Sequence, residues 1–263
     1  MTEHDKKFFS LLLSIVLDCG AVSVAHAESA SIHTRGGNEF DILVSTYRYD
    51  EPTLDVATTG DKFGVGHTGA LKLNGDWFIK DDAKFVYGKV DYVGSGFQTN
   101  APDWYYEVRG LMGRDVQVGG GMLSPYVGIG YRYLFNDLRG YSSTGAVGYR
   151  RESNYLYVPM GVTHRFLMQD SAVLATTFEY DYFVQGKQFS RLSDTGIAGY
   201  PDVTNNQNSG FGFRADVMYT MSDWAFGPFF NVWNVNDSDM VLGIGLEPRN
   251  RTTEFGMRIK FRF

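Results

Sequence analysis

Residues 251–263 decide the fold, and they read R-T-T-E-F-G-M-R-I-K-F-R-F. Alternate positions fall into two sets with opposite character. The apolar set is Thr253, Phe255, Met257, Ile259, Phe261 and Phe263, and the polar set is Thr252, Glu254, Gly256, Arg258, Lys260 and Arg262. Strict alternation is typical of a β-strand whose two faces meet different media. The stretch therefore predicts a strand between an apolar and a polar environment.

The last residues of this strand resemble a motif of a known family. Phe263 follows apolar residues at alternate positions, namely Phe255, Met257, Ile259 and Phe261. This pattern resembles the C-terminal signal of bacterial outer-membrane β-barrel proteins, in which a terminal Phe is read by the barrel-insertion machinery. The resemblance implies that the barrel-insertion machinery is a partner of this chain during biogenesis. It also predicts that upstream segments repeat the alternation, joined by connections that are short and long in turn.

The first residues look like a secretory signal peptide. Lys6 and Lys7 precede an apolar run over residues 8–17, and the A-x-A sequence of residues 25–27 is a cleavage site. The apolar run has about ten residues, which is too short for a membrane-spanning helix. We expect residues 1–27 to be removed after export across the inner membrane, and residues 28–38 to form a periplasmic lead-in. Cys19 is the only cysteine, so the mature chain would contain no disulfide.

Nine further segments repeat the alternation of the last strand. They are residues 39–49, 62–73, 82–92, 103–113, 122–135, 154–166, 172–184, 210–221 and 224–235. Long polar loops are predicted at residues 51–61, 93–102, 136–153, 185–209 and 236–250, with short turns between them. The hydrocarbon core of a membrane contains no water to hydrogen-bond unpaired backbone groups. Strands that cross a membrane must therefore close into a barrel, in which every backbone group is paired. The sequence predicts an all-β fold over residues 39–263: a transmembrane, antiparallel, up-and-down β-barrel of about ten strands.

The third of these strands is the least regular. Val86, Gly88, Val90 and Tyr92 are placed on the outward face, which puts Phe85, Tyr87, Lys89 and Asp91 inward. Both faces carry apolar and polar residues, so the opposite assignment also fits the pattern.

A soluble barrel with an apolar interior would also alternate. The positions of large aromatic residues favour the membrane form. These residues gather at both ends of the apolar face, as they do at the two water–lipid interfaces of membrane barrels. The outer group is Trp104, Tyr133, Phe135, Tyr182 and Phe211, and the inner group is Trp224, Phe226, Phe261 and Phe263. We therefore expect a monomer in the outer membrane of a Gram-negative bacterium, with membrane lipid and lipopolysaccharide as partners. The formal charge of −6 argues against nucleic acid.

The inward face carries charged residues on most strands. They are Glu107, Arg109, Arg132, Arg165, Glu179, Asp181, Arg214, Asp216, Glu254, Arg258 and Lys260. A lumen of this size is little wider than the side chains that fill it, so these charges must pair. One interpretation is a salt-bridged plug that stiffens the barrel. The other is a narrow ion path that slightly favours anions.

Sequence motifs that would indicate catalysis or cofactor binding match this chain only weakly. Omptin proteases, which are ten-stranded outer-membrane barrels, resemble this chain in strand count and topology, and they use an Asp pair and an Asp–His pair at the extracellular rim. Here the pair Asp81-Asp82 is placed before the third strand at the periplasmic end, and no His is predicted at the outer rim on an inward face. The Gly64-x-Gly66-x-x-Gly69 pattern continues into a strand where a dinucleotide site needs a helix. We predict no catalytic residue, no cofactor and no metal site.

These observations favour a structural or surface-recognition barrel with a mostly plugged lumen. A narrow porin-like channel is the alternative. An omptin-like protease is disfavoured because the rim His is missing.

Overall fold

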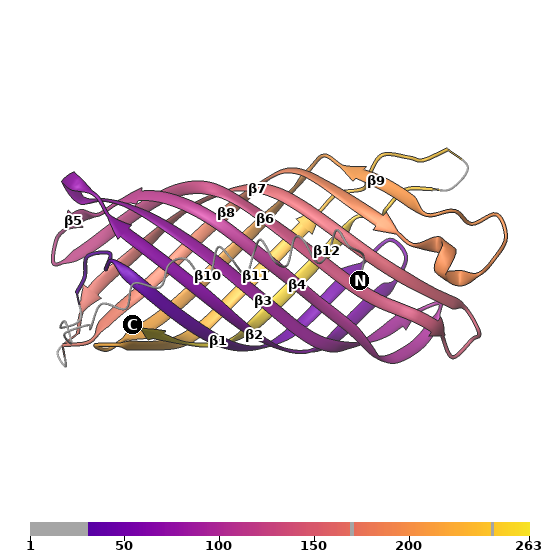
Figure 1. Cartoon of the computed structure of the whole chain (residues 1–263), viewed down its shortest axis with the longest axis horizontal. Coiled ribbons are helices and arrows are strands. Elements are labelled where there is room, and N and C mark those ends of the chain that lie inside the picture. The colour runs from indigo at the N-terminus through magenta and orange to yellow at the C-terminus, as the bar shows by residue number, and fades with distance from the viewer. Residues whose placement is uncertain (1–30, 169–170, 243–244) are drawn as a thin grey trace.

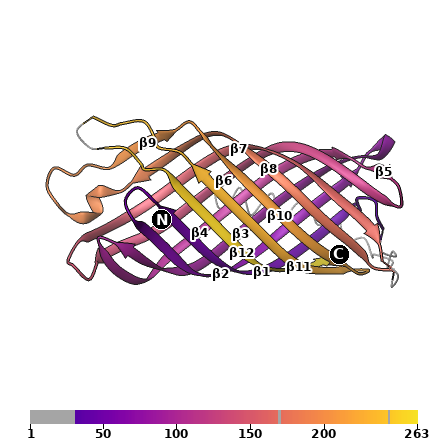
Figure 2. The ribbon, with the colours of Figure 1, turned by 180° about the vertical axis from the view of Figure 1, so that it is seen from behind.

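A computed structural model describes residues 31–168, 171–242 and 245–263, and they form one closed β-barrel (Figures 1 and 2). Every strand pairs antiparallel with its neighbours, and the pairing of β8 with β10 closes the ring. The predicted fold class is confirmed, while residues 1–27 lie outside the described residues. The ten barrel strands are β1 (Gly37–Glu51), β2 (Val56–Lys72), β3 (Trp77–Gly94), β4 (Gly96–Arg114), β6 (Gly121–Tyr141), β7 (Val147–Leu167), β8 (Val173–Ser190), β10 (Gly210–Thr220), β11 (Trp224–Val235) and β12 (Asn250–Arg262).

The barrel has two different ends. At one end, which we call the turn end, lie the residues before β1, the C-terminus, the short 3-10 turn η1 (Asn74–Asp76) and the short strand β5 (Val116–Val118). The other end, the loop end, carries the short strand β9 (Val203–Gln207), the 3-10 turn η2 (Leu192–Thr195) and the loop 236–249. In Figure 1 the label C marks the turn end and the label β9 marks the loop end. No helix among the described residues is long and apolar enough to cross a bilayer.

Three of the predicted long loops are mostly strand. β1 runs to residue 51 and β2 starts at residue 56, only residue 95 separates β3 from β4, and residues 142–146 join β6 to β7. The predictions for loops 51–61, 93–102 and 136–153 were therefore wrong in their bounds. Beyond the apolar band the outer face of a strand is largely polar, so the alternation that marks a half-buried strand is lost although the backbone ladder continues. The barrel is consequently longer than its apolar band.

The outer surface shows the expected aromatic groups near the two borders of an apolar band. Toward the loop end the ring of Trp104 lies 5.2 Å from Phe135 and 5.3 Å from Tyr133, measured between centroids. At the turn end Trp224 stacks on Phe226 at 5.4 Å. The outward residues of β12 are exposed, and they are Phe255, Met257, Ile259, Phe261 and Phe263. Together these side chains give the barrel the apolar belt that a bilayer requires.

The two faces of the third strand are the reverse of those predicted. Val86 and Val90 are fully buried, whereas Phe85 and Tyr87 are exposed on the outer surface. Phe85 packs 5.7 Å from Trp104 in the outer aromatic group. With this orientation Lys84 turns into the lumen, where it pairs with Glu107 of β4. The Asp81-Asp82 pair also lies inside β3, and not before it.

A glycine in β11 tests how closely the strands fit. A Cβ atom on Gly227 would lie 1.8 Å from the carbonyl oxygen of Val217 on β10. We expect Gly227→Ala to force β10 and β11 apart, because the obstacle is backbone that cannot rotate away. The change should lower the temperature at which the protein loses its fast-migrating, unboiled form on SDS gels.

Gly120 supplies the control, since a Cβ there meets nothing within 4 Å. Gly120→Ala should leave the transition temperature unchanged. Equal temperatures for the two variants would show that the β10–β11 contact does not limit stability.

Candidate functional site

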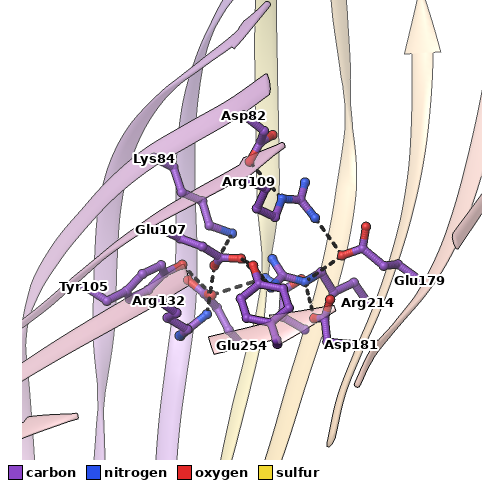
Figure 3. Close-up of polar contacts among 12 residues, drawn as sticks. Asp82, Lys84, Tyr105, Glu107, Arg109, Arg132, Glu179, Asp181, Arg214 and Glu254 are labelled. Carbon is purple, nitrogen blue, oxygen red and sulfur yellow. Dashed lines mark hydrogen bonds and ion pairs between the residues drawn. The ribbon is translucent and has the colours of Figure 1, made fainter. Parts of the chain in front are cut away.

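A network of buried charges crosses the middle of the lumen (Figure 3). Glu107 on β4 lies at its centre and has no solvent exposure. Its carboxylate lies 3.3 Å from the Lys84 ammonium on β3 and 3.3 Å from the Arg132 guanidinium on β6. Arg214 on β10 also pairs with Glu107, and the Tyr157 hydroxyl on β7 donates a hydrogen bond to it. One carboxylate thus connects four other strands of the barrel.

Arg214 extends this network to β8. Its Nε lies 2.7 Å from Asp181 and 3.0 Å from Glu179. Arg109 continues the chain of contacts, because it lies 2.6 Å from Glu179 and 3.1 Å from Asp82. The pairing follows from strand register, since alternate residues of neighbouring strands point into the same narrow space.

Glu254 on β12 is held by neutral donors. Its carboxylate accepts hydrogen bonds from the hydroxyls of Ser45 at 2.7 Å and Tyr105 at 2.8 Å, and from the Asn231 amide at 3.3 Å. The Arg132 guanidinium lies 4.0 Å from the centre of the Tyr105 ring. Glu254 therefore joins the same layer through Tyr105. We call this set the central network: Asp82, Lys84, Tyr105, Glu107, Arg109, Arg132, Tyr157, Glu179, Asp181, Arg214 and Glu254.

Seven of the predicted luminal charges belong to the central network: Glu107, Arg109, Arg132, Glu179, Asp181, Arg214 and Glu254. Sequence reasoning missed Lys84 and Asp82, because it assigned the two faces of β3 the wrong way round. It also overlooked Tyr105, although this residue shares its face with Glu107 two positions later. The inward carboxylate of Glu107 on the neighbouring strand β4, which pairs with Lys84, is the signal that would have assigned the inward face of β3 correctly.

The remaining four predicted charges lie nearer the turn end. The Arg258 guanidinium is 3.3 Å from Asp41, and the Lys260 ammonium is 3.4 Å from Glu39. Arg165 donates a 2.7 Å hydrogen bond to Ser124. Asp216 faces the same space and forms no ion pair with any residue that the structure describes.

Aromatic side chains complete the filling of the lumen. The Trp233 ring lies 5.0 Å from Tyr157 and 6.0 Å from Tyr155, and Tyr155 lies 5.3 Å from Phe183. Hollow space remains on both sides of this layer: a cavity of about 180 Å³ toward the turn end and one of about 40 Å³ toward the loop end. The central network and these rings thus occupy the cross-section between two separate cavities.

A second charged cluster lies where the loop 236–249 meets the barrel wall. The Arg151 guanidinium on β7 lies 2.6 Å from Glu51 and also pairs with Glu247 of the loop. Tyr49 donates a 2.7 Å hydrogen bond to Glu51. One guanidinium therefore serves two carboxylates. Burial raises the pKa of Glu247 above its ordinary value, although Arg151 opposes the shift.

Solved structures with a similar fold are outer-membrane barrels. The outer membrane protease OmpT from Escherichia coli matches with a TM-score of 0.59 and 12% identity, over 90% of this chain and 100% of OmpT. The translocator domain of the autotransporter NalP from Neisseria meningitidis gives a TM-score of 0.42 and 12% identity, over 88% and 90% of the two chains. Neisserial surface protein A gives 0.34 and 11%, over 90% and 100%. No family model matches the chain, and neither does any curated protein sequence.

The likeness to OmpT establishes the outer-membrane β-barrel fold and nothing about chemistry, because the identity is only 12%. Within the described part of the chain, no group of three or more His, Cys, Asp and Glu side chains could hold a metal ion. The three histidines found there, His33, His67 and His164, all lie in the half of the barrel nearer the turn end.

The central network predicts a large effect for one substitution. Glu107→Gln leaves three cations facing a neutral amide, and removing one partner of a buried ion pair costs about 3–5 kcal/mol. We expect this loss in the free energy of unfolding, measured by denaturant titration in detergent micelles. Asp137→Asn is the control, because Asp137 pairs with the exposed Arg139 and such pairs contribute about 0–1 kcal/mol. Similar losses in both variants would contradict a network centred on Glu107.

The raised pKa of Glu247 predicts a pH dependence for loop docking. The docked loop binds a proton more readily than the free loop, so docking strengthens as pH falls through the raised pKa and weakens as pH rises. The Asp239 amide, which donates to the Asn206 carbonyl of β9 at 2.9 Å, reports on docking. After correction for intrinsic rates, its hydrogen exchange should be slower at about pH 5 than at about pH 8. Glu247→Gln should abolish this difference, and a difference that survives the substitution would assign it to another group.

Proposed function

We propose that this protein is an integral outer-membrane barrel that does not conduct solutes and that acts in surface recognition at its loop end. The central network carries the proposal. Its ion pairs join strands from both sides of the barrel, and bulky side chains fill the space around them. The two largest fully buried side chains of the described residues, Trp233 and Arg132, lie in this layer. A pathway for ions would have to break several buried ion pairs at once.

The form of the loop end supports the recognition role. β6 and β7 continue well beyond the outer aromatic group, and their outward residues there are polar, including Asp137, Arg139 and Arg150. Arg150 pairs with Asp194 of η2 at 2.7 Å, which fixes the loop 191–202 to the strand. Figure 2 shows the hairpins and loops projecting together at this end. Recognition surfaces are commonly built on such rigid scaffolds.

The same features support a proposal for the orientation in the membrane. Short turns and both ends of the barrel chain lie at the turn end, as in barrels whose termini face the periplasm. The loop end would then face the outside of the cell, above the lipopolysaccharide leaflet. The C-terminal residues Phe255, Met257, Ile259, Phe261 and Phe263 would serve as the insertion signal, and the barrel would act as a monomer.

A catalytic role has less support. An omptin-like mechanism needs an imidazole beside carboxylates at the extracellular rim, and the described part of the loop end has no histidine. Its buried carboxylates Glu51 and Glu247 are both engaged by Arg151. We therefore propose that the protein is not an enzyme, despite sharing its fold with a protease.

Planar-bilayer recording tests the proposal and its channel alternative. The refolded wild-type protein should give no conductance steps, because the central network fills the lumen. A general porin, reconstituted in the same way, shows that the assay detects an open barrel. Discrete and reproducible steps from the wild-type protein would overturn the proposal and establish the narrow channel.

A designed opening strengthens the test. The double variant Arg132→Ala, Trp233→Ala removes the two largest buried side chains and should conduct, provided that its unboiled form still migrates fast on SDS gels. Conductance in this variant alone would locate the seal in the central network.

A further inference from the structure

The cavity at the turn end is a candidate binding site that the proposed function does not use. It occupies about 180 Å³ between the central network and the residues before β1. Thr34 bonds to Asp115 through its backbone N–H at 2.7 Å and its hydroxyl at 2.8 Å, and Arg35 donates to the carbonyl of Ser222. These contacts hold residues 31–36 across the mouth of the barrel. The cavity has room for several water molecules or for a small solute.

The wall of this cavity carries more cations than carboxylates. Nine Arg and Lys side chains and five Asp and Glu side chains line it. Glu107, Asp115 and Asp181 pair with some of these cations from behind the wall, and counting all three still leaves nine positive charges against eight negative ones. A charge excess in a confined, low-dielectric space attracts counter-ions of the opposite sign.

Lys80 on β3 has no counter-charge of its own. Its ammonium forms no hydrogen bond or ion pair with any described residue, although it lines the cavity and is partly buried. The nearest carboxylates are already engaged. Arg109 holds Asp82 at 3.1 Å, and Glu39 is shared by Lys260 and Arg262.

Lys260 is the second cation of this cavity whose ammonium group can contact a further anion. Its ammonium reaches Glu39 at 3.4 Å and the Thr68 hydroxyl at 3.5 Å, which are long contacts for a charged donor. Lys260 is also the charge that acts most strongly on Lys80. Two like charges that line one cavity are stabilised by an anion between them.

We propose that the turn-end cavity binds a small oxyanion of the phosphate class, contacted by the ammonium groups of Lys80 and Lys260. Lysine binds phosphate as a point charge, and its flexible stem lets the two ammonium groups converge on one ligand. The Thr68 hydroxyl lies beside Lys260 and can donate a further hydrogen bond to the ligand. The proposal concerns binding from one side of the barrel, so it holds whether or not the lumen conducts.

Phosphate binding can be measured directly by isothermal titration of the refolded protein in a non-ionic detergent and a phosphate-free buffer. Inorganic phosphate should bind saturably to the wild-type protein at one site per chain. Lys80→Gln and Lys260→Gln should each weaken binding at least tenfold, while Lys80→Arg, which keeps the charge, should retain most of it. Lys89→Gln is the matched control, because Lys89 lies on the same strand but is exposed on the outer surface.

Two outcomes would overturn the proposal: no saturable binding to the wild-type protein, or equal affinities in the Lys80→Gln and Lys89→Gln variants. Migration of unboiled samples confirms that each variant is folded. Glycerol phosphate, titrated in parallel, distinguishes the two sources of the ligand. Tighter binding than that of inorganic phosphate assigns the site to a phosphate monoester head group, and weaker binding assigns it to the free ion.

Discussion

A lumen enclosed by ten strands is too narrow to hold a charged side chain apart from its counter-charge. This constraint explains most of what lies inside the barrel. Glu107 is completely buried, and it is tolerated there because Lys84, Arg132 and Arg214 converge on it from three other strands. These ion pairs also fix which residues face each other across the barrel. Under the proposed function, the network that stabilises the interior is also the one that closes it.

The proposed closure would divide the molecule into parts with different roles. The space nearer the loop end is small and largely filled with aromatic rings, and above it the strands continue into a rigid surface of hairpins. The space nearer the turn end is larger and lined by an excess of cations. Under the two proposals, recognition and ion binding would occur at opposite ends of one barrel without exchange between them. The fold itself, shared with OmpT at 12% identity, does not select among such roles.

The sequence predicted the fold well because lipid imposes a strict period of two. Strand number, order and the outward face of β12 all followed from that period. The predictions failed where the imposed pattern ends, since polar residues cover both faces of the strands beyond the apolar band and so resemble loops. β3 was reversed because both of its faces carry apolar residues, and this error concealed Lys84. Pairing across the lumen depends on strands far apart in sequence, so the pattern of one strand alone cannot predict it.

Water permeability tests most directly whether the central network seals the barrel, because water is smaller than any ion with its hydration shell. Proteoliposomes containing the wild-type protein should shrink under an osmotic gradient at the same rate as protein-free vesicles, as followed by stopped-flow light scattering. A faster, protein-dependent rate in the wild type would mean that a continuous water path crosses the central network, and it would contradict a sealed lumen.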